Sequence, residues 1–309
     1  MAYKLSKAQI KKVVANGSKK LYDYCRDNNI HYVVTGSSGG LDSAVTLGFA
    51  ARACQLARKD GFALTSVGLI MPCHSCADAG NLGQKAIEKF GAQEIYIDLT
   101  SVCDFITEEI PHLNAQIRKV LKTTKGQNSL NNWSWSEKIS SGNIKARLRM
   151  MLGTYHVARM LGGMVLSTDN LSEYMMGFWT INGDVGDFGI IQHVFKGLEL
   201  YDVARYLGVP KEIIAAKPDD GLGVAGGDED QLGAAYPILD QVMIRQIQAG
   251  FDLNGGWEQM KTLKNIKGVP EKVVKRLCER ALGTAYKRRG TITLNREDLG
   301  LPPIKKIKL

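Results

Sequence analysis

Short β-branched segments alternate with longer helix-forming stretches in the first half of the chain, and this alternation restricts the fold more than any other feature. The predicted strands are residues 31–35, 64–71, 94–98 and 163–167. The predicted helices between them are residues 42–58, 77–90, 102–121 and 143–161. Strands joined by helices form parallel sheets that are covered on both faces. The sequence therefore predicts an α/β fold with a doubly wound, mostly parallel sheet.

The rest of the chain predicts one domain over 1–309, without a repeat or a low-complexity linker. An amphipathic helix at about 5–28 precedes the first strand. The polar stretch 122–142 is expected to be a long surface loop, of the kind that is usually functional or mobile. Its residues Trp133 and Trp135 either pack on a ligand or partner subunit, or anchor the loop to its own core.

The charge and the cysteine content of the chain limit the kinds of binding partner and the cellular compartment that we expect. The 309 residues include 40 Lys and Arg against 31 Asp and Glu, and the net charge of +9 suits a polyanionic partner without choosing among them. No apolar run approaches the roughly 20 residues of a membrane span, and the start lacks a signal sequence. We expect a cytoplasmic protein with no membrane partner and with reduced thiols. Cys73 and Cys76 are interpreted as a loop after a strand, because no second pair completes a metal site.

A glycine-rich loop between the first predicted strand and the following helix is the strongest candidate for a binding site. Backbone amides at such a helix start can cradle a phosphate. The loop lacks the Gly-Lys-Ser/Thr ending of the Walker loop and the spacing of the dinucleotide fingerprint. An aspartate beside phosphate makes sense if it holds Mg²⁺. The loop consists of Gly36, Ser37, Ser38, Gly39, Gly40, Leu41, Asp42 and Ser43.

A second polar loop, 167–173, follows the apolar strand 163–167 and should meet the glycine loop at the carboxyl edge of the sheet. Asp42 and Glu173 can converge there on one Mg²⁺, because such ions take one or two carboxylates together with phosphate oxygens. Asp169 is equally suited to capping the next helix.

Three cations lie in the segment 143–150, at the expected start of a helix. The helix dipole disfavours cations there, so Lys145 and Arg147 point to an anionic partner. For Arg149 a solvated helix face is the favoured interpretation.

These motifs resemble a known family. Ser-Gly-Gly-Leu-Asp-Ser at 38–43 resembles the pyrophosphate loop of the N-type ATP pyrophosphatases, and the segments 143–150 and 167–173 closely resemble those of NAD synthetases. The same order of motifs continues at 177–187, 199–210, 228–233 and 286–289. The resemblance runs from about Val33 to Arg289 and implies an adenine nucleotide alpha hydrolase-like fold.

The resemblance also implies the roles of individual residues. The glycine loop, Thr168 and Lys196 would contact ATP, with Asp42 and Lys196 acting in catalysis and Asp42 and Glu173 binding Mg²⁺. The residues that would bind deamido-NAD, partly across a homodimer interface, are Arg147, Asp187 and Lys287.

Three positions depart from the family pattern. Ile181 stands where the family has Lys in the substrate pocket, Tyr286 where it has His, and Asp219 where it has a Thr at an ATP-binding position. Isoleucine cannot replace the charge interaction of a lysine with an acidic substrate. The pocket is therefore either remodelled for deamido-NAD or suited to another acid such as nicotinate mononucleotide.

By this resemblance the reaction is the ATP-dependent amidation of deamido-NAD to NAD through an acyl-adenylate, with release of pyrophosphate and AMP. Ammonia is the expected nitrogen donor, because Gly36 leaves no room for an amidase domain ahead of it. The alternatives are amidation of nicotinate mononucleotide, a tRNA-modifying member of the superfamily, and a nucleotide-binding regulator without catalysis. Nucleic acid is the less expected partner, because the 143–187 segments match NAD synthetases closely.

Overall fold

A five-stranded parallel sheet forms the centre of the computed structural model, which describes residues 3–75, 77–123, 133–224, 226–301, 303 and 305. The strand order is β3-β2-β1-β4-β5, and every pairing is parallel. The order reverses between β1 and β4, so the loops that follow these two strands flank the position at which such sheets bind ligands. The strands are β1 (Tyr32–Gly36), β2 (Thr65–Ile70), β3 (Gln93–Tyr96), β4 (Met164–Ser167) and β5 (Phe188–Gly189).

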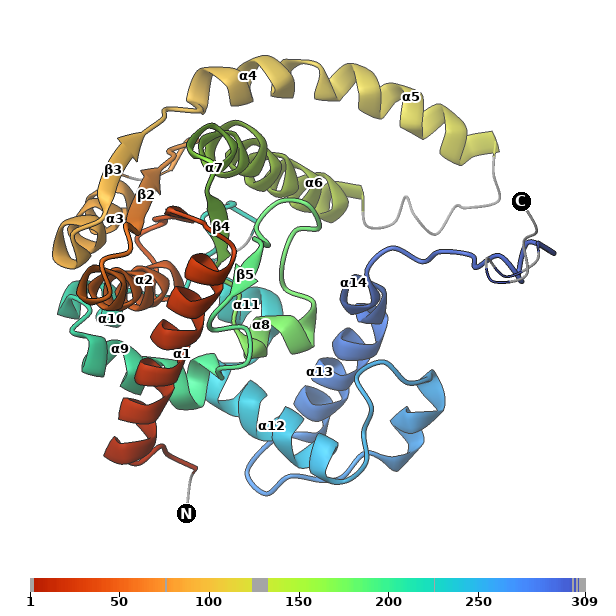
Figure 1. Ribbon diagram of the computed structural model, residues 1–309. Helices are drawn as coiled ribbons and strands as arrows, with labels where there is room; N and C mark the ends of the chain where they lie inside the picture. The colour runs from red at the N-terminus through yellow and green to blue at the C-terminus, as the bar shows by residue number, and fades with distance from the viewer. Residues whose placement is uncertain are drawn as a thin grey trace.

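Consecutive residues of β1 pack on opposite layers of helices, which confirms the doubly wound fold. Val33 packs with residues of α1 (Lys7–Asp27) and α2 (Leu41–Lys59). Val34 packs with Met150 and Ala158 of the other layer. Alternate side chains of a strand point to opposite faces, so both faces of the sheet are covered by helices (Figure 1).

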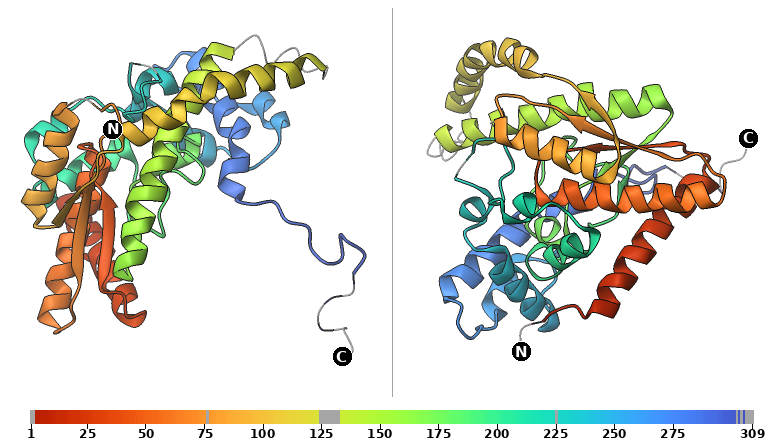
Figure 2. Two further views of the ribbon diagram at one scale, coloured as in Figure 1. Left: turned by 90° about the horizontal axis from the view of Figure 1, so that it is seen from above. Right: turned by 90° about the vertical axis from the view of Figure 1, so that its left-hand side faces the viewer.

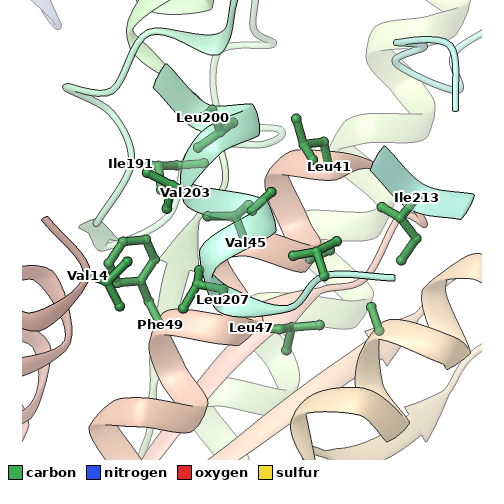
Figure 3. Close-up of a cluster of buried hydrophobic side chains, with 14 of the residues drawn as sticks. Val14, Leu41, Val45, Leu47, Phe49, Ile191, Leu200, Val203, Leu207 and Ile213 are labelled. Carbon is green, nitrogen blue, oxygen red and sulfur yellow. The ribbon is translucent and has the colours of Figure 1, made fainter. Parts of the chain in front are cut away.

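The helix that follows the glycine loop is buried along most of its length. Apolar side chains of α2, including Val45 and Phe49, point toward those of η3 (Lys196–Leu200) and α9 (Tyr201–Leu207) in Figure 3. Leu200 and Val203 are fully buried in this cluster. The core therefore fixes the start of α2 relative to the segment that carries Lys196.

A second hydrophobic core lies beside the sheet layers, between α8 (Leu171–Met176), α12 (Tyr236–Gln248) and α13 (Glu271–Gly283). In Figure 2 these three helices lie next to the sheet and the helices that cover it. The remaining elements are α3 (Ala77–Phe90), α4 (Thr100–Glu108), α5 (Ile110–Thr123), α6 (Trp133–Leu148), η2 (Arg149–Thr154), α7 (Tyr155–Leu161), α10 (Lys211–Ala215), α11 (Asp228–Leu232), η4 (Trp257–Thr262) and α14 (Ala285–Arg289). None of the helices in the described part of the chain is long and apolar enough to cross a membrane.

The polar stretch 122–142 was predicted to be a loop, and this is wrong at both ends. Residues 122–123 complete α5, and 133–142 form the first turns of α6. Residues 124–132 lie outside the described part. The serine and asparagine residues of this stretch favour turns, and for this reason the sequence pattern did not predict the start of α6.

The predicted helix 143–161 consequently begins too late. The true helix starts ten residues earlier, at Trp133, and passes through a π-helical segment, η2, into α7. The predicted helix 102–121 is divided into α4 and α5. Lys145 and Arg147 lie in the last turn of α6, and because the helix continues through η2, they stand at neither end of a helix dipole. Their position in the helix therefore does not itself require an anionic partner.

Candidate active site

The glycine loop turns sharply between β1 and α2 and packs closely on α3. Gly39 has φ +83°, and a Cβ added there would lie 2.4 Å from the carbonyl oxygen of Ala79. The Ser37 hydroxyl donates to the carbonyl of Gly83 (2.9 Å). The Ser38 and Ser43 hydroxyls lie 3.1 Å apart across the turn. Backbone contacts with α3 therefore set the shape of the loop.

Gly40 is the N-cap residue of α2, and among the described residues no side chain hydrogen-bonds to this helix start from the cap position. The amide of Gly40 donates to Ser38 Oγ (3.2 Å), and the amides of the first turn of α2 receive no cap side chain and could meet an anion, as is typical of phosphate-binding loops. Asp42 lies in the first turn of α2, on the side of Lys196. The sequence prediction of an anion site at this loop fits this geometry.

Lys196 is buried within a group of three carboxylates. Its Nζ lies 2.8 Å from Asp42 Oδ2, 3.1 Å from Glu173 Oε1 and 3.4 Å from Asp228 Oδ2. The ring of Tyr236 lies below the ammonium, with its centroid 4.5 Å from Nζ. Lys196 begins η3 and is 4% exposed, so the fold places a buried cation beside the phosphate loop.

Burial dominates the electrostatics of this group. It raises the pKa of Glu173, against the opposing effect of Lys196, and it raises the pKa of Asp228. The surrounding carboxylates hold the pKa of Lys196 well above its ordinary value, although burial alone lowers it. Lys196 is thus the cation shared by three acidic side chains whose burial would otherwise be costly.

Glu173 also fixes its own helix. The Asn170 side chain accepts from the amide of Glu173 (3.0 Å), and Glu173 Oε2 accepts from the amide of Asn170 (3.3 Å), which forms a capping box at α8. Asn170 Nδ2 donates to Asp42 Oδ1 (2.8 Å) and links this loop to α2. Asn170 therefore caps the helix, and Asp169 does not; Asp169 instead accepts from Ser167 and Gln192.

A second group of cations surrounds the turn 177–181. Lys287 Nζ donates to the carbonyls of Gly177 (2.8 Å) and Trp179 (2.6 Å). Arg147 Nε donates to the carbonyl of Ile181 (3.2 Å). Burial lowers the pKa of Lys287, and the charge of Arg147 lowers it further. Two cations from α6 and α14 thus meet at one turn, with the exposed side chains of Ile181 and Tyr286 on the same segments.

The other candidate residues lie in more varied settings. Asp187 accepts from the Tyr155 hydroxyl (2.7 Å) and the amide of Val165 (2.9 Å). Burial lowers the pKa of Lys287, and the charge of Asp184, three residues before Asp187, partly offsets this lowering. Asp219 is exposed and accepts from the amide of Gly221 (2.8 Å). Thr168 is half-buried directly after β4.

Arg149 does not belong to a solvated helix face, which corrects the favoured interpretation of the sequence. Its Nε donates to the carbonyl of Met71 and its Nη2 to the Ser75 hydroxyl, both at 3.2 Å. Burial lowers the pKa of its guanidinium. The π-helical turn of η2 directs this side chain inward, toward the loop after β2. Of the cysteine pair, Cys73 is buried, whereas Cys76 lies outside the described residues.

Sequence reasoning missed three members of the site: Asn170, Asp228 and Tyr236. The Tyr236 hydroxyl donates to Asp228 (3.0 Å) and Glu173 (3.2 Å). Asp228 belongs to an acidic turn that was recognised only as a motif. The one signal in the sequence for Asp228 was its place at the start of a helix. An aspartate is common there because it stabilises the helix dipole, so the sequence alone does not identify it as a site residue.

The parallel sheet, the glycine loop at its switch point and the buried lysine among carboxylates are typical of a nucleotide-binding α/β enzyme. The model of the NAD synthase family matches residues 13–291. The chain belongs to this family and is a ligase of it, which confirms the resemblance found in the sequence. The NH3-dependent NAD+ synthetase of Pyrococcus furiosus is 31% identical over 285 residues, which cover 92% of this chain and 96% of that protein.

Solved structures agree on the fold. The NMN synthetase of Francisella tularensis has a TM-score of 0.68 at 24% identity, covering 93% of this chain and 98% of that one. The NH3-dependent NAD synthetase of Campylobacter jejuni has a TM-score of 0.62 at 21% identity, covering 93% and 99%. At these identities the likeness concerns the fold alone.

Proposed function

We propose that the chain amidates deamido-NAD to NAD with ATP and ammonia. The observation that supports this reaction best is the buried Lys196 beside the anion-binding loop, in a chain of the NAD synthase family. The nicotinate carboxylate attacks the α-phosphorus of ATP, and the bond to the departing pyrophosphate breaks. Ammonia then attacks the acyl carbon, AMP leaves with the oxygen, and one proton is released.

ATP places its β- and γ-phosphates against the amides of the glycine loop at the start of α2. Lys196 offsets the negative charge that develops on the phosphates as pyrophosphate departs. Thr168 and Asp219 remain proposed ATP contacts, and so do the side chains of Ser38 and Ser43. These residues bind and orient the substrates, since adenylation needs no side-chain nucleophile.

The residues also fit a magnesium ion that enters with ATP. Asp42 and Glu173 already share one cation, the ammonium of Lys196, and Asp228 Oδ1 is buried and has no partner among the described residues. No group of three or more acidic, His or Cys side chains in the described part is arranged to hold a metal alone. Asp42 and Glu173 would therefore hold Mg²⁺ together with phosphate oxygens, and the ion would neutralise phosphate charge.

The acid substrate is placed at the turn 177–181. Arg147 and Lys287 supply positive charge for the pyrophosphate of deamido-NAD, and Tyr286 is exposed at the same place. Asp187 remains a proposed contact of this substrate. The first experiment mixes the protein with Mg-ATP, ammonium chloride and deamido-NAD and quantifies AMP and NAD together. One-to-one formation supports the proposal, and ATP turnover without NAD contradicts it.

Nicotinate mononucleotide is a second candidate, because Ile181 places an exposed apolar side chain where the family has a lysine. The two acids are compared by kcat/KM in the same assay. Ile181→Lys should raise kcat/KM for deamido-NAD about fivefold, since one new ion pair contributes on the order of 1 kcal/mol. Ile238→Lys on α12 is the matched control, because its side chain is equally exposed. A larger gain for the mononucleotide would favour the second candidate.

We also infer that the chain forms a homodimer. Large apolar side chains are exposed on α4 to α7, which lie along one side of the molecule in Figure 1. They include Phe105, Leu113, Ile117, Trp135, Ile139, Met151, Tyr155 and Met160. Extended apolar surfaces of this kind mark protein interfaces, and a second copy would cover them.

Light scattering should give about twice the chain mass of 33.9 kDa. Leu113→Glu and Met160→Glu should each produce monomer, because they place a charge in the apolar interface. Ile292→Glu lies on the C-terminal segment and serves as the control. A monomeric wild-type protein at micromolar concentration would contradict the dimer.

A further inference from the structure

Three consecutive backbone amides at the start of η3 are each held by a side chain. The amide of Phe195 donates to Glu199 Oε2 (2.9 Å), that of Lys196 to Ser172 Oγ (2.9 Å), and that of Gly197 to Asp240 Oδ2 (2.8 Å). Helix starts normally leave such donors to water or to a single cap. Here the segment that carries the site lysine is fixed from α8, from α12 and from its own first turn.

Asp240 is the centre of this arrangement. The Ser172 hydroxyl donates to Asp240 Oδ1 (2.5 Å) while its oxygen accepts from the amide of Lys196. Both side chains are fully buried. Asp240 thus acts on Lys196 by two routes, through Ser172 and through the neighbouring amide of Gly197. A buried acid that makes only backbone and hydroxyl contacts is costly, which argues for a role beyond filling the core.

Close packing also restricts the backbone at Gly197. A Cβ added to Gly197 would lie 2.4 Å from the backbone nitrogen of Pro237, at the start of α12. The backbone of η3 therefore lies directly against the helix that carries Asp240. Tyr236 extends from this same turn to the ammonium of Lys196.

We propose that Asp240 is a positioning residue for Lys196, holding through Ser172 and Gly197 the backbone from which the lysine reaches the phosphate site. This inference rests on the proposed function, in which Lys196 acts on ATP. Asp240 itself touches none of the reacting atoms. It connects α12, which belongs to the second hydrophobic core, with the backbone that carries Lys196 beside the sheet.

The test compares variants of two buried residues on α12. Asp240→Ala removes both anchors, and Asp240→Asn keeps one oxygen acceptor. Gln246→Ala is the matched control, because Gln246 is also buried and bonds to the backbone of Lys264 twice, far from the site (2.7 and 3.1 Å). Asp240→Ala should lower kcat for AMP formation at least tenfold, with a smaller change in KM for ATP and a partial loss in Asp240→Asn. Gln246→Ala should stay within about twofold.

A merely structural role would not give the next two results. In a Lys196→Met background, Asp240→Ala should reduce kcat no further, because the group that it positions is gone. Hydrogen exchange of the peptide containing 195–200 should be faster in Asp240→Ala than in Gln246→Ala. Losses of kcat that multiply in the double variant, or unchanged exchange at 195–200, would overturn the inference.

The two proposals fail in different ways. A wild-type protein that forms no AMP contradicts the proposed function, while the exchange measurement still decides whether Asp240 anchors η3. A Lys196→Met variant with normal kcat removes the lysine from the mechanism, and with it the positioning role of Asp240.

Discussion

At the scale of single residues, the site depends on a lysine that is buried because carboxylates compensate its charge. Asp42, Glu173 and Asp228 come from α2, α8 and α11, and each contacts the same ammonium. The glycine loop and Glu173 were identified from the sequence because phosphate loops and acidic loops at strand ends have local signatures. Asp228 was not, because its role depends on a contact with Lys196, 32 residues earlier.

Asp42→Asn tests this group. The amide retains the shape and can still accept from Asn170, but it loses the charge that pairs with Lys196 and that the proposed magnesium ion would need. We expect AMP formation to fall at least about 100-fold while the melting temperature changes by only a few degrees. Asp60→Asn, at the opposite end of α2, should remain active. Near-normal turnover of Asp42→Asn would refute the magnesium assignment.

At the scale of elements, α3 limits the space beside the glycine loop at Gly39. Gly39 and Gly61 both have positive φ, of +83° and +71°, but only Gly39 would bring a Cβ against backbone. Gly61→Ala should cost about 1 kcal/mol from left-handed strain alone. Gly39→Ala should cost more and should also weaken ATP binding, measured by calorimetry. Equal stability and equal ATP affinity in the two variants would contradict this role of α3.

Helix boundaries were the weakest part of the sequence analysis, and the error affected the site. Starting a helix at 143 placed Lys145 and Arg147 at the positive end of a dipole, whereas they lie in the last turn of α6. The expectation of an anionic ligand there consequently loses its dipole argument. It now rests on the hydrogen bonds of Arg147 from α6 and Lys287 from α14 to one turn, 177–181, which are visible only in three dimensions.

At the scale of the whole molecule, buried acids make stability depend on pH. Burial raises the pKa of Asp184 and of Asp240 from 3.8 to about 7. The folded state therefore binds more protons than the unfolded state between pH 3.8 and about pH 7. The resulting stabilisation is complete below pH 3.8 and is lost as the pH rises to about 7. Each acid contributes on the order of a few kcal/mol.

Urea unfolding at pH 5 and pH 8 measures this contribution. Asp184→Asn should reduce the difference in unfolding free energy between the two pH values, because it removes one of the titrating groups. Asp60→Asn, at the exposed end of α2, should leave the difference unchanged. An Asp184→Asn protein with the wild-type pH dependence would show that Asp184 does not titrate in this range.

The parallel α/β sheet and the family could be predicted from the sequence alone, because alternating strands and helices and the glycine-rich and neighbouring motifs are local patterns. The contacts of Asp228 and Tyr236 with Lys196, and of Asp240 with the amide of Gly197, follow only from the three-dimensional fold. These residues follow the lysine by 32 to 44 positions and reach it through the packing of a second core. Contacts between distant segments depend on how two cores fit together, and local periodicity contains no information about that fit.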